Sequence, residues 1–262
     1  MIVTLLSDYG YQDNYVGITK AVLYRLLPDA RIIDIAHDIT PHHLLQCAYL
    51  LSGSLYAFPP QTVHLSLFGV LYHIPPKVLL TQHNDQYIIS ADNGLLPLVG
   101  GQDPESRIYC CPEIPANYME WIQIAAALIG QIEKETIDRS RLVPHQPDVY
   151  PVPLRPVIKD NSIDCNIVHI DRFGNVVLNL RKEEFERYSN NRKFRIVLRR
   201  NDYIESVSEH YASVQPEERL CLFNSSGFLE IAINQGDASK LLGLKLFDPR
   251  QVNYQSIKIE FL

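Results

Sequence analysis

Several features that would place this chain in a familiar class are missing from its sequence. No apolar run approaches the roughly 20 residues that a membrane-spanning helix needs. No long run of Lys and Arg provides the basic surface of a nucleic-acid binder, and the formal net charge is −6. We therefore expect neither a membrane nor a nucleic acid among the partners of this chain.

Cysteines are few, and their number does not suit a disulfide framework. There are five, an odd number, and their spacings match no zinc pattern. The adjacent pair Cys110 and Cys111 cannot readily bridge to each other, which favours reduced, mostly buried thiols.

Residues 1–6 lead straight into a turn with no basic segment before them, so they do not resemble a signal peptide. We expect a soluble, cytoplasmic protein without a metal site.

The motifs of several common chemistries are also absent. The sequence contains no GxGxxG, no Walker A loop, no GxSxG elbow and no HExxH. His42 and His43 are adjacent rather than four residues apart, so a solvated helix start after Pro41 is favoured over a metal site. What is present is a globular composition, with 46% hydrophobic and 21% charged residues.

Strand and helix signals alternate through the first half of the chain, which favours a mostly parallel sheet covered by helices on both faces. Short apolar runs bounded by turns predict the strands, and apolar residues at helical spacing predict the helices. The expected strands are 2–6, 32–35, 63–68, 78–81 and 87–90, and the expected helices are 16–27, 44–57 and 121–132.

A proline-rich stretch then separates two compositions. Proline at five positions in 142–157 is incompatible with a helix or a central strand. Beyond it the pattern is β-rich, and only 238–242 has helical character. We expect an N-terminal α/β sandwich domain (1–143), a linker (144–158) and a smaller, barrel-like C-terminal β domain (159–262). The expected later strands are 163–170, 176–180, 194–198, 219–223, 228–233 and 257–261.

Polar turns follow several of these strands, where ligands of parallel sheets lie. Asp8 follows the first strand, and its carboxylate could accept two hydrogen bonds from a vicinal diol such as a ribose. Alternatively it caps the next helix, although Asp13 or Asn14 could do so instead. The turn Asp92-Asn93-Gly94, taken alone, is an ordinary β-turn.

Two polar turns lie in the β-rich half. Asp171-Arg172-Phe173-Gly174-Asn175 is either a simple hairpin loop or an adenine site, with an amide reading the base edge beside a stacking ring. Asn224-Ser225-Ser226-Gly227 precedes a strand that contains Glu230, which either holds an ammonium group or is an ordinary exposed residue.

Taken together, the order and spacing of these turns resemble the S-adenosyl-L-methionine (SAM) hydroxide adenosyltransferases, also called SAM hydrolases, which are relatives of the fluorinase and chlorinase enzymes. The resemblance covers nearly the whole chain. The matching segments are Leu5-Leu6-Ser7-Asp8-Tyr9-Gly10, Asp13-Asn14-Tyr15-Val16-Gly17, Ile33-Asp34-Ile35-Ala36-His37-Asp38-Ile39, Ala91-Asp92-Asn93-Gly94-Leu95-Leu96, His169-Ile170-Asp171-Arg172-Phe173-Gly174-Asn175, Asn224-Ser225-Ser226-Gly227 and Leu229-Glu230-Ile231-Ala232-Ile233-Asn234-Gln235-Gly236.

The resemblance implies a homotrimer in which SAM lies between the N-terminal domain of one subunit and the C-terminal domain of its neighbour. It implies attack of water on the ribose C5′, releasing adenosine and methionine without a metal or organic cofactor. Asp8 would bind the ribose hydroxyls, Phe173 and Asn175 the adenine, and Asp171, Ser225 and Glu230 the methionine moiety. The full set of implied substrate-binding residues is Asp8, Tyr9, Asn93, Asp171, Phe173, Asn175, Ser225 and Glu230.

The sequence departs from the family at its water-positioning residues. The family's Asp-Pro-Gly-Val-Gly segment with its following Arg is replaced in 67–77, and the family His is absent from 117–121. His73, Lys77 and Glu120, with Tyr72, are candidates for a substitute polar cluster. No counterpart of the family's halide-site Ser is evident near Met119, which disfavours halogenation.

Two hypotheses follow. The first is a SAM hydrolase with an altered catalytic cluster, and the second is an inactive binder of SAM or adenosine that acts as a sensor or scaffold.

Overall fold

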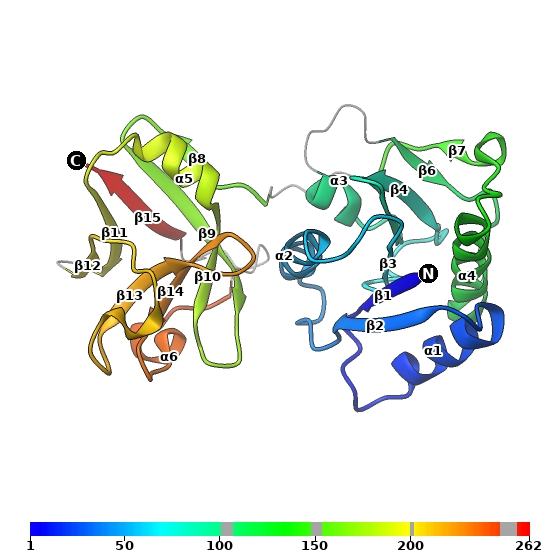
Figure 1. The fold of residues 1–262 in the computed structure, drawn as a ribbon, viewed down its shortest axis with the longest axis horizontal. Coiled ribbons are helices and arrows are strands. Elements are labelled where there is room, and N and C mark those ends of the chain that lie inside the picture. The colour runs from blue at the N-terminus through cyan, green and yellow to red at the C-terminus, as the bar shows by residue number, and fades with distance from the viewer. Residues whose placement is uncertain (101–106, 148–153, 200–201, 247–255) are drawn as a thin grey trace. The chain divides into compact units, whose positions relative to one another are not determined.

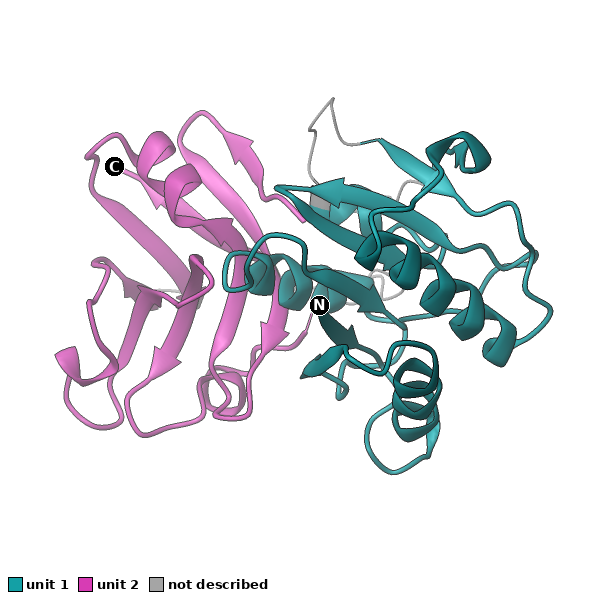
Figure 2. Cartoon of the chain, turned by 45° about the vertical axis from the view of Figure 1, so that its right-hand side comes forward, with its two compact units in different colours: residues 1–151 teal, residues 152–262 magenta. Residues whose placement is uncertain are grey.

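The computed structural model describes residues 1–100, 107–147, 154–199, 202–246 and 256–262. The chain divides into two compact units, Met1–Pro151 and Val152–Leu262, which are coloured teal and magenta in Figure 2. Each unit has its own hydrophobic core. Residues 148–153 of the expected linker lie outside the described residues.

Unit 1 is built on a seven-stranded sheet with the order β2-β1-β3-β5-β4-β6-β7. The strands β2, β1, β3 and β5 run parallel, as expected from the alternation of strands and helices. Beyond β5 the pairs are antiparallel. The strands are β1 (Ile2–Leu6), β2 (Arg31–Ala36), β3 (Val63–Ser66), β4 (Leu79–His83), β5 (Gln86–Ser90), β6 (Ile108–Cys110) and β7 (Val143–Pro144).

A two-residue turn explains why β4 and β5 are antiparallel. Asn84 and Asp85 join the strands, and both have positive φ, 48° and 58°. Two successive positive φ values are typical of the tight hairpin turn whose twist matches the flanking strands, and Asn and Asp tolerate them best after Gly. The Asn-Asp pair was therefore a hairpin signal in the sequence.

Helices cover both faces of this sheet (Figure 1). On one face α1 packs against α4, and on the other α2 packs against α3. The helices are α1 (Tyr15–Leu26), α2 (Leu44–Leu55), α3 (Leu95–Gly100) and α4 (Tyr118–Glu133), with a 3₁₀ turn at Arg139–Arg141. None of the helices in the described ranges combines the length and apolar character needed to cross a membrane.

The start of α2 differs from the solvent-exposed helix start that the sequence predicts after Pro41. His43 is largely buried, and its ring Nδ1 accepts a hydrogen bond of 3.1 Å from the backbone N–H of Gln46. An imidazole thus caps the helix in place of a Ser or Asp. His42 has a φ of 66° and lays its ring against Tyr72, with ring centroids 4.8 Å apart.

Unit 2 is a barrel-like sheet in which all strand pairs of the path are antiparallel, with the order β12-β11-β15-β9-β10-β14-β13 and β8 beside β9. Its two outer strands approach each other, and an ion pair between Arg219 and Asp202 joins them. The strands are β8 (Val157–Lys159), β9 (Ser162–Ile170), β10 (Val176–Arg181), β11 (Phe194–Arg199), β12 (Asp202–Ile204), β13 (Arg219–Phe223), β14 (Phe228–Ile233) and β15 (Ser256–Phe261).

The expectation of a single helix in the second half was wrong. Besides α6 (Ala238–Leu242), unit 2 contains α5 (Lys182–Ser189), which follows β10 directly. Phe185 is its one buried hydrophobic residue, so the apolar stripe that marks a helix in sequence is nearly absent. The remaining signal was electrostatic, because Glu183 and Glu184 lie in the first turn and Arg187 in the last, where they complement the helix dipole.

All five cysteines are free thiols, and four of them are buried, as expected. Burial raises the pKa of Cys111 and Cys221 to about 12, so both remain protonated at neutral pH.

Trp121 is the largest fully buried side chain in the described residues. Its ring Nε1–H donates a 2.9 Å hydrogen bond to the backbone carbonyl of Lys77, which fixes the segment before β4. We predict that Trp121→Phe lowers the free energy of unfolding by about 1–3 kcal/mol, because the partly buried carbonyl of Lys77 loses its donor. Urea denaturation measures the change.

The matched control is Tyr24→Phe on α1, whose side chain is half-exposed. This variant should stay within about 0.5 kcal/mol of the parent chain. An equal, small effect of both substitutions would contradict the structural role of the indole N–H.

Candidate functional site

Polar loops follow β1, β3 and β5 at one edge of the sheet in unit 1. Asp8, in the loop after β1, accepts a 2.8 Å hydrogen bond at Oδ2 from the hydroxyl of Tyr72, in the loop after β3. The other carboxylate oxygen, Oδ1, is buried and has no hydrogen-bond partner within the described chain. Burial, followed by the hydrogen bond to Asp8, raises the pKa of Tyr72, so its hydroxyl keeps its proton and acts as a donor.

A chain of side-chain contacts holds the turn that contains Asp8. The Ser7 hydroxyl lies 2.6 Å from Nδ1 of His37, and Nε2 of His37 lies 3.2 Å from Oδ1 of Asp34. Asp34 in turn accepts a 2.6 Å hydrogen bond from Lys20 on α1. Burial raises the pKa of Asp34, but the hydrogen bonds from Lys20 and His37 outweigh it, and the net shift is downward. Asp34 is therefore ionised and orients the buried imidazole.

Backbone hydrogen bonds fix the same turn to the end of β2. The N–H of Ser7 donates to the carbonyl of Ala36 at 3.0 Å, and the N–H of Gly10 donates to the carbonyl of His37 at 2.8 Å. Gly10 has a φ of 66°, a conformation that glycine adopts without strain. The turn is thus held at both ends, which leaves the Asp8 carboxylate at a defined place.

Tyr9 and Asn93 have local partners in unit 1. The ring of Tyr9 packs against Tyr15 and Tyr118, with centroids 5.3 and 5.7 Å away. Burial, and then the neighbouring Tyr118, raise the pKa of Tyr9. Asn93 caps the start of α3 and donates a 2.7 Å hydrogen bond from Nδ2 to the carbonyl of Phe68, which ties the loop after β5 to the loop after β3.

The three candidate catalytic residues do not form a joint cluster. Glu120 lies in the first turn of α4, whose N-cap is Asn117, and its carboxylate accepts hydrogen bonds from the N–H of Ala116 at 2.8 Å and from the side chain of Asn117 at 3.0 Å. Lys77 pairs with Asp92 at 2.8 Å. His73 lies in an exposed loop. Capping explains Glu120, because Asn-x-x-Glu is a helix-start pattern.

Sequence reasoning missed the residue that accompanies Lys77. His145 Nε2 lies 2.8 Å from the same Asp92 oxygen that Lys77 contacts. Asp92 was visible as part of a turn at a strand end, whereas His145 belongs to the proline-rich stretch interpreted as a linker. Nothing local in the sequence distinguished His145 from a solvated linker residue.

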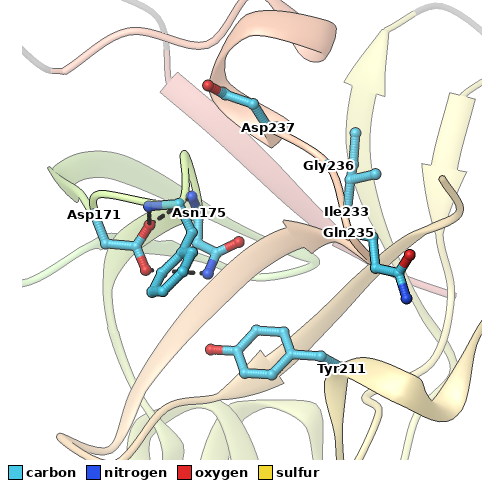
Figure 3. A pocket seen from close by; sticks show the side chains of 8 residues that line it. Asp171, Asn175, Tyr211, Ile233, Gln235, Gly236 and Asp237 are labelled. Atoms are coloured by element: carbon cyan, nitrogen blue, oxygen red, sulfur yellow. Dashed lines mark hydrogen bonds between the residues drawn. The ribbon is translucent and has the colours of Figure 1, made fainter. Parts of the chain in front are cut away.

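Unit 2 contains a cavity of about 570 Å³ at the carboxyl end of β14, where the loop after this strand begins (Figure 3). It combines carboxylates, amides and two aromatic rings, which suits a ligand with a flat ring and polar edges. Its lining residues are Asp171, Phe173, Asn175, Tyr211, Ile233, Gln235, Gly236 and Asp237. The predicted residues Asp171, Phe173 and Asn175 thus lie together.

The carboxylate of Asp171 organises this loop. Its Oδ1 accepts hydrogen bonds of 2.9 Å from the N–H groups of Phe173 and Asn175, and its Oδ2 accepts one of 3.0 Å from Nδ2 of Asn175. A Cβ at Gly174, where φ is 84°, would lie 2.2 Å from Asp237, so no other residue fits without displacement. The loop presents Phe173, a residue that is 77% exposed.

Glu230 does not line the cavity itself but is hydrogen-bonded to Tyr211, which does. It is 4% exposed and accepts hydrogen bonds from Tyr211 at 2.7 Å and from Nδ2 of Asn224 at 3.1 Å. Burial raises the pKa of Glu230, partly offset by these two donors. Ser225 is exposed on the adjoining turn. Tyr211, which connects Glu230 to the cavity, was not singled out from the sequence because it lies in a short 3₁₀ turn, Tyr211–Ser213, outside the predicted strands.

Within the described residues, no group of three or more His, Cys, Asp or Glu side chains is placed to hold a metal ion. The polar groups of both sites are hydrogen-bond donors and acceptors suited to an organic ligand.

The fold and these sites define a two-unit protein: an α/β unit with polar loops at the carboxyl edge of its sheet, and a barrel-like β unit with a polar, aromatic cavity. Sequence models of the SAM hydroxide adenosyltransferase N-terminal and C-terminal domains match residues 3–120 and 165–251. The chain belongs to the SAM hydroxide adenosyltransferase family.

Individual relatives match along nearly their whole length. The (R)-S-adenosyl-L-methionine hydrolase of Methanocaldococcus jannaschii is 29% identical, over 97% of this chain and 96% of the relative. The protein of that name from Thermus thermophilus is 26% identical, over 93% and 96%. A crystal structure of an uncharacterized conserved protein from Thermotoga maritima aligns with a TM-score of 0.81 at 28% identity, covering 99% of both chains.

Removing the Ser7 hydroxyl tests the contact chain behind Asp8. We predict that Ser7→Ala lowers the free energy of unfolding by about 1–3 kcal/mol, because it leaves a buried imidazole nitrogen without its partner. Thermal and urea denaturation measure this loss. The buried control is Ser52→Ala in α2, whose hydroxyl donates to the helix carbonyl of Tyr49, and it should change stability little. Equal effects of the two variants would refute the role given to His37.

Proposed function

We propose that this chain hydrolyses SAM to adenosine and L-methionine by attack of water on the ribose C5′. Relatives that match over nearly their full lengths carry the name SAM hydrolase, which supports this reaction. The observation that carries the proposal is the Asp8 carboxylate, held in a rigid turn with one oxygen still lacking a partner in the described chain.

A ribose supplies what Asp8 lacks. Two adjacent hydroxyl groups can donate to the two carboxylate oxygens once the groups that cover Oδ1 make room, with Tyr72 sharing Oδ2. Hydrogen bonds to an ionised acceptor contribute about 1.5–3 kcal/mol each. Asp8 thus supplies much of the affinity for a nucleoside in this proposal.

The cavity of unit 2 suits the adenine and methionine parts. Phe173 offers an exposed face for stacking, and the bond from Nδ2 of Asn175 to Asp171 orients the amide so that its Oδ1 can accept from an amino group. Asp171, Ser225 and Glu230, the last through Tyr211, supply oxygen atoms for the methionine ammonium group.

The chemistry needs no metal and no organic cofactor in this proposal. The sulfonium of SAM is already a good leaving group. The protein therefore has to orient the attacking water molecule and remove part of the hydration shell around it. The positive charge of SAM also suits a site lined by carboxylates.

We propose further that the complete site forms between subunits of a homotrimer. Asp8 and the cavity suited to adenine belong to different compact units, and in this proposal each unit contributes part of the contacts to SAM. Unit 1 of one subunit and unit 2 of its neighbour then share one ligand.

A second candidate function is binding of SAM or adenosine without turnover, as a sensor or scaffold. It is favoured by one observation about two candidates for water positioning: Glu120 is bonded to the start of α4, and His73 lies in an exposed loop. The binding residues are present under either function.

Incubation with SAM separates the two functions. We expect the chain to release adenosine and methionine in equal amounts, as measured by chromatography after removal of the protein. A parallel reaction without protein corrects for spontaneous decay of SAM. Tight binding in calorimetry without adenosine release would establish the binder instead.

Asp8→Ala tests the ribose contact. We predict a loss of affinity for adenosine and SAM of at least about 100-fold, because the hydrogen bonds to a charged acceptor disappear. Calorimetry measures the affinity, and circular dichroism verifies that the fold is intact. Unchanged affinity would show that Asp8 does not contact the ligand.

Mixing the inactive variants Asp8→Ala and Asn175→Ala tests the shared site. If neighbouring subunits contribute the two halves, mixed oligomers contain some sites with both residues intact and recover part of the activity. Recovery should be absent when each variant is kept alone. Absence of recovery after proven subunit exchange would contradict a site built from two subunits.

A further inference from the structure

A carboxylate shared by a lysine and a histidine lies in unit 1, apart from the residues already discussed for ligand binding. Oδ2 of Asp92 is 2.8 Å from Nζ of Lys77 and 2.8 Å from Nε2 of His145. The Asp92 side chain is 7% exposed, and that of His145 is 18% exposed. A buried ion pair rarely adds stability, so this arrangement calls for another explanation.

Three different strands position the cluster. Asp92 follows β5, Lys77 lies just before β4, and His145 follows β7. The Lys77 carbonyl is bonded to the Trp121 indole, and the His145 N–H donates to the carbonyl of Ile108 at 2.9 Å. The backbones of Lys77 and His145, the two partners of Asp92, are therefore fixed.

The electrostatics keep the carboxylate ionised and the imidazole oriented. Burial raises the pKa of Asp92, but hydrogen bonds from Lys77 and His145 outweigh it and the net shift is downward. The nearby Cys110 is a neutral thiol. Burial raises the pKa of Cys110, the charge of Lys77 lowers it by less, and the charge of Asp92 raises it further. With an anion at Nε2, neutral His145 places its proton there and leaves the lone pair on Nδ1.

The cluster continues the polar edge that contains Asp8. Tyr72, after β3, contacts Asp8 after β1, and Asn93, beside Asp92, bonds to the carbonyl of Phe68 after β3. The strands β1 and β5 flank β3, which separates their ends by about 10 Å, or two strand spacings. That span suits a ribose bound at Asp8 with its C5′ directed toward β5 and one water molecule beyond it.

We infer that His145 is the general base that takes the proton from the attacking water, with Asp92 as its positioning residue and Lys77 as the counter-charge of Asp92. This inference rests on the proposed SAM hydrolysis and identifies residues for its chemical step. Glu120 and His73 are not needed for it.

The step is balanced in atoms and charge. The water oxygen bonds to C5′ while the C5′–S bond breaks, and its electron pair remains on sulfur to give the neutral thioether of methionine. The water proton passes to Nδ1 of His145, and Asp92 stabilises the imidazolium that results. Because His145 is partly exposed, the proton then leaves to solvent.

The test compares His145→Gln with His83→Gln in the full chain. His83 pairs with Gln86 at the start of β5, so it lies at the opposite edge of the sheet from Asp92. We expect His145→Gln to lower kcat for adenosine release by about 100-fold to 10,000-fold, with unchanged affinity for SAM in calorimetry. The control should retain the parent kcat.

A second variant separates catalysis from structure. His145→Ala leaves space for added imidazole, which should restore part of the activity in a concentration-dependent manner, a response that a merely structural residue does not give. If the parent chain releases adenosine and His145→Gln keeps its kcat, or imidazole restores nothing, the inference is wrong while the proposed function stands. A parent chain without turnover overturns both.

Discussion

The parallel direction of β1, β3 and β5 is the constraint on which the polar edge of unit 1 depends. Parallel neighbours bring their carboxyl ends to one edge of a sheet, so the loops that follow them meet although they lie far apart in the chain. Asp8, Tyr72 and Asn93 follow three different strands and are connected by hydrogen bonds across the loops. Were any of the three strands reversed, its loop would lie at the opposite edge.

Carboxylates that are buried or partly buried recur where the molecule holds a polar group in place. Asp34 orients His37. Asp92 contacts both Lys77 and His145. Glu230 accepts hydrogen bonds from Tyr211 and Asn224. Burying a charge is costly unless donors compensate it, so each carboxylate imposes a geometry on its partners. Asp171 does the same locally with two backbone N–H groups, and this gives unit 2 a rigid loop in which Phe173 remains exposed.

The sequence predicted most of unit 1 because its elements have strong apolar periods and clear turns. It predicted less where the signal is local chemistry rather than hydrophobicity. The Asn84-Asp85 hairpin made β4 antiparallel, and α5 was missed because Phe185 is its single buried apolar residue. Glu120 was assigned to a possible catalytic cluster although its Asn-x-x-Glu spacing is a capping pattern.

The sequence by itself determined the kinds of elements, the polar turns after the strands and the resemblance to one family, since these depend on local composition and order. Only the tertiary structure decided which side chains meet. His145 lies 53 positions from Asp92, and Ser7 lies 30 from His37, so no local pattern pairs them. Strand order and packing bring them within hydrogen-bond distance, because a contact between distant residues is set by the path of the whole chain.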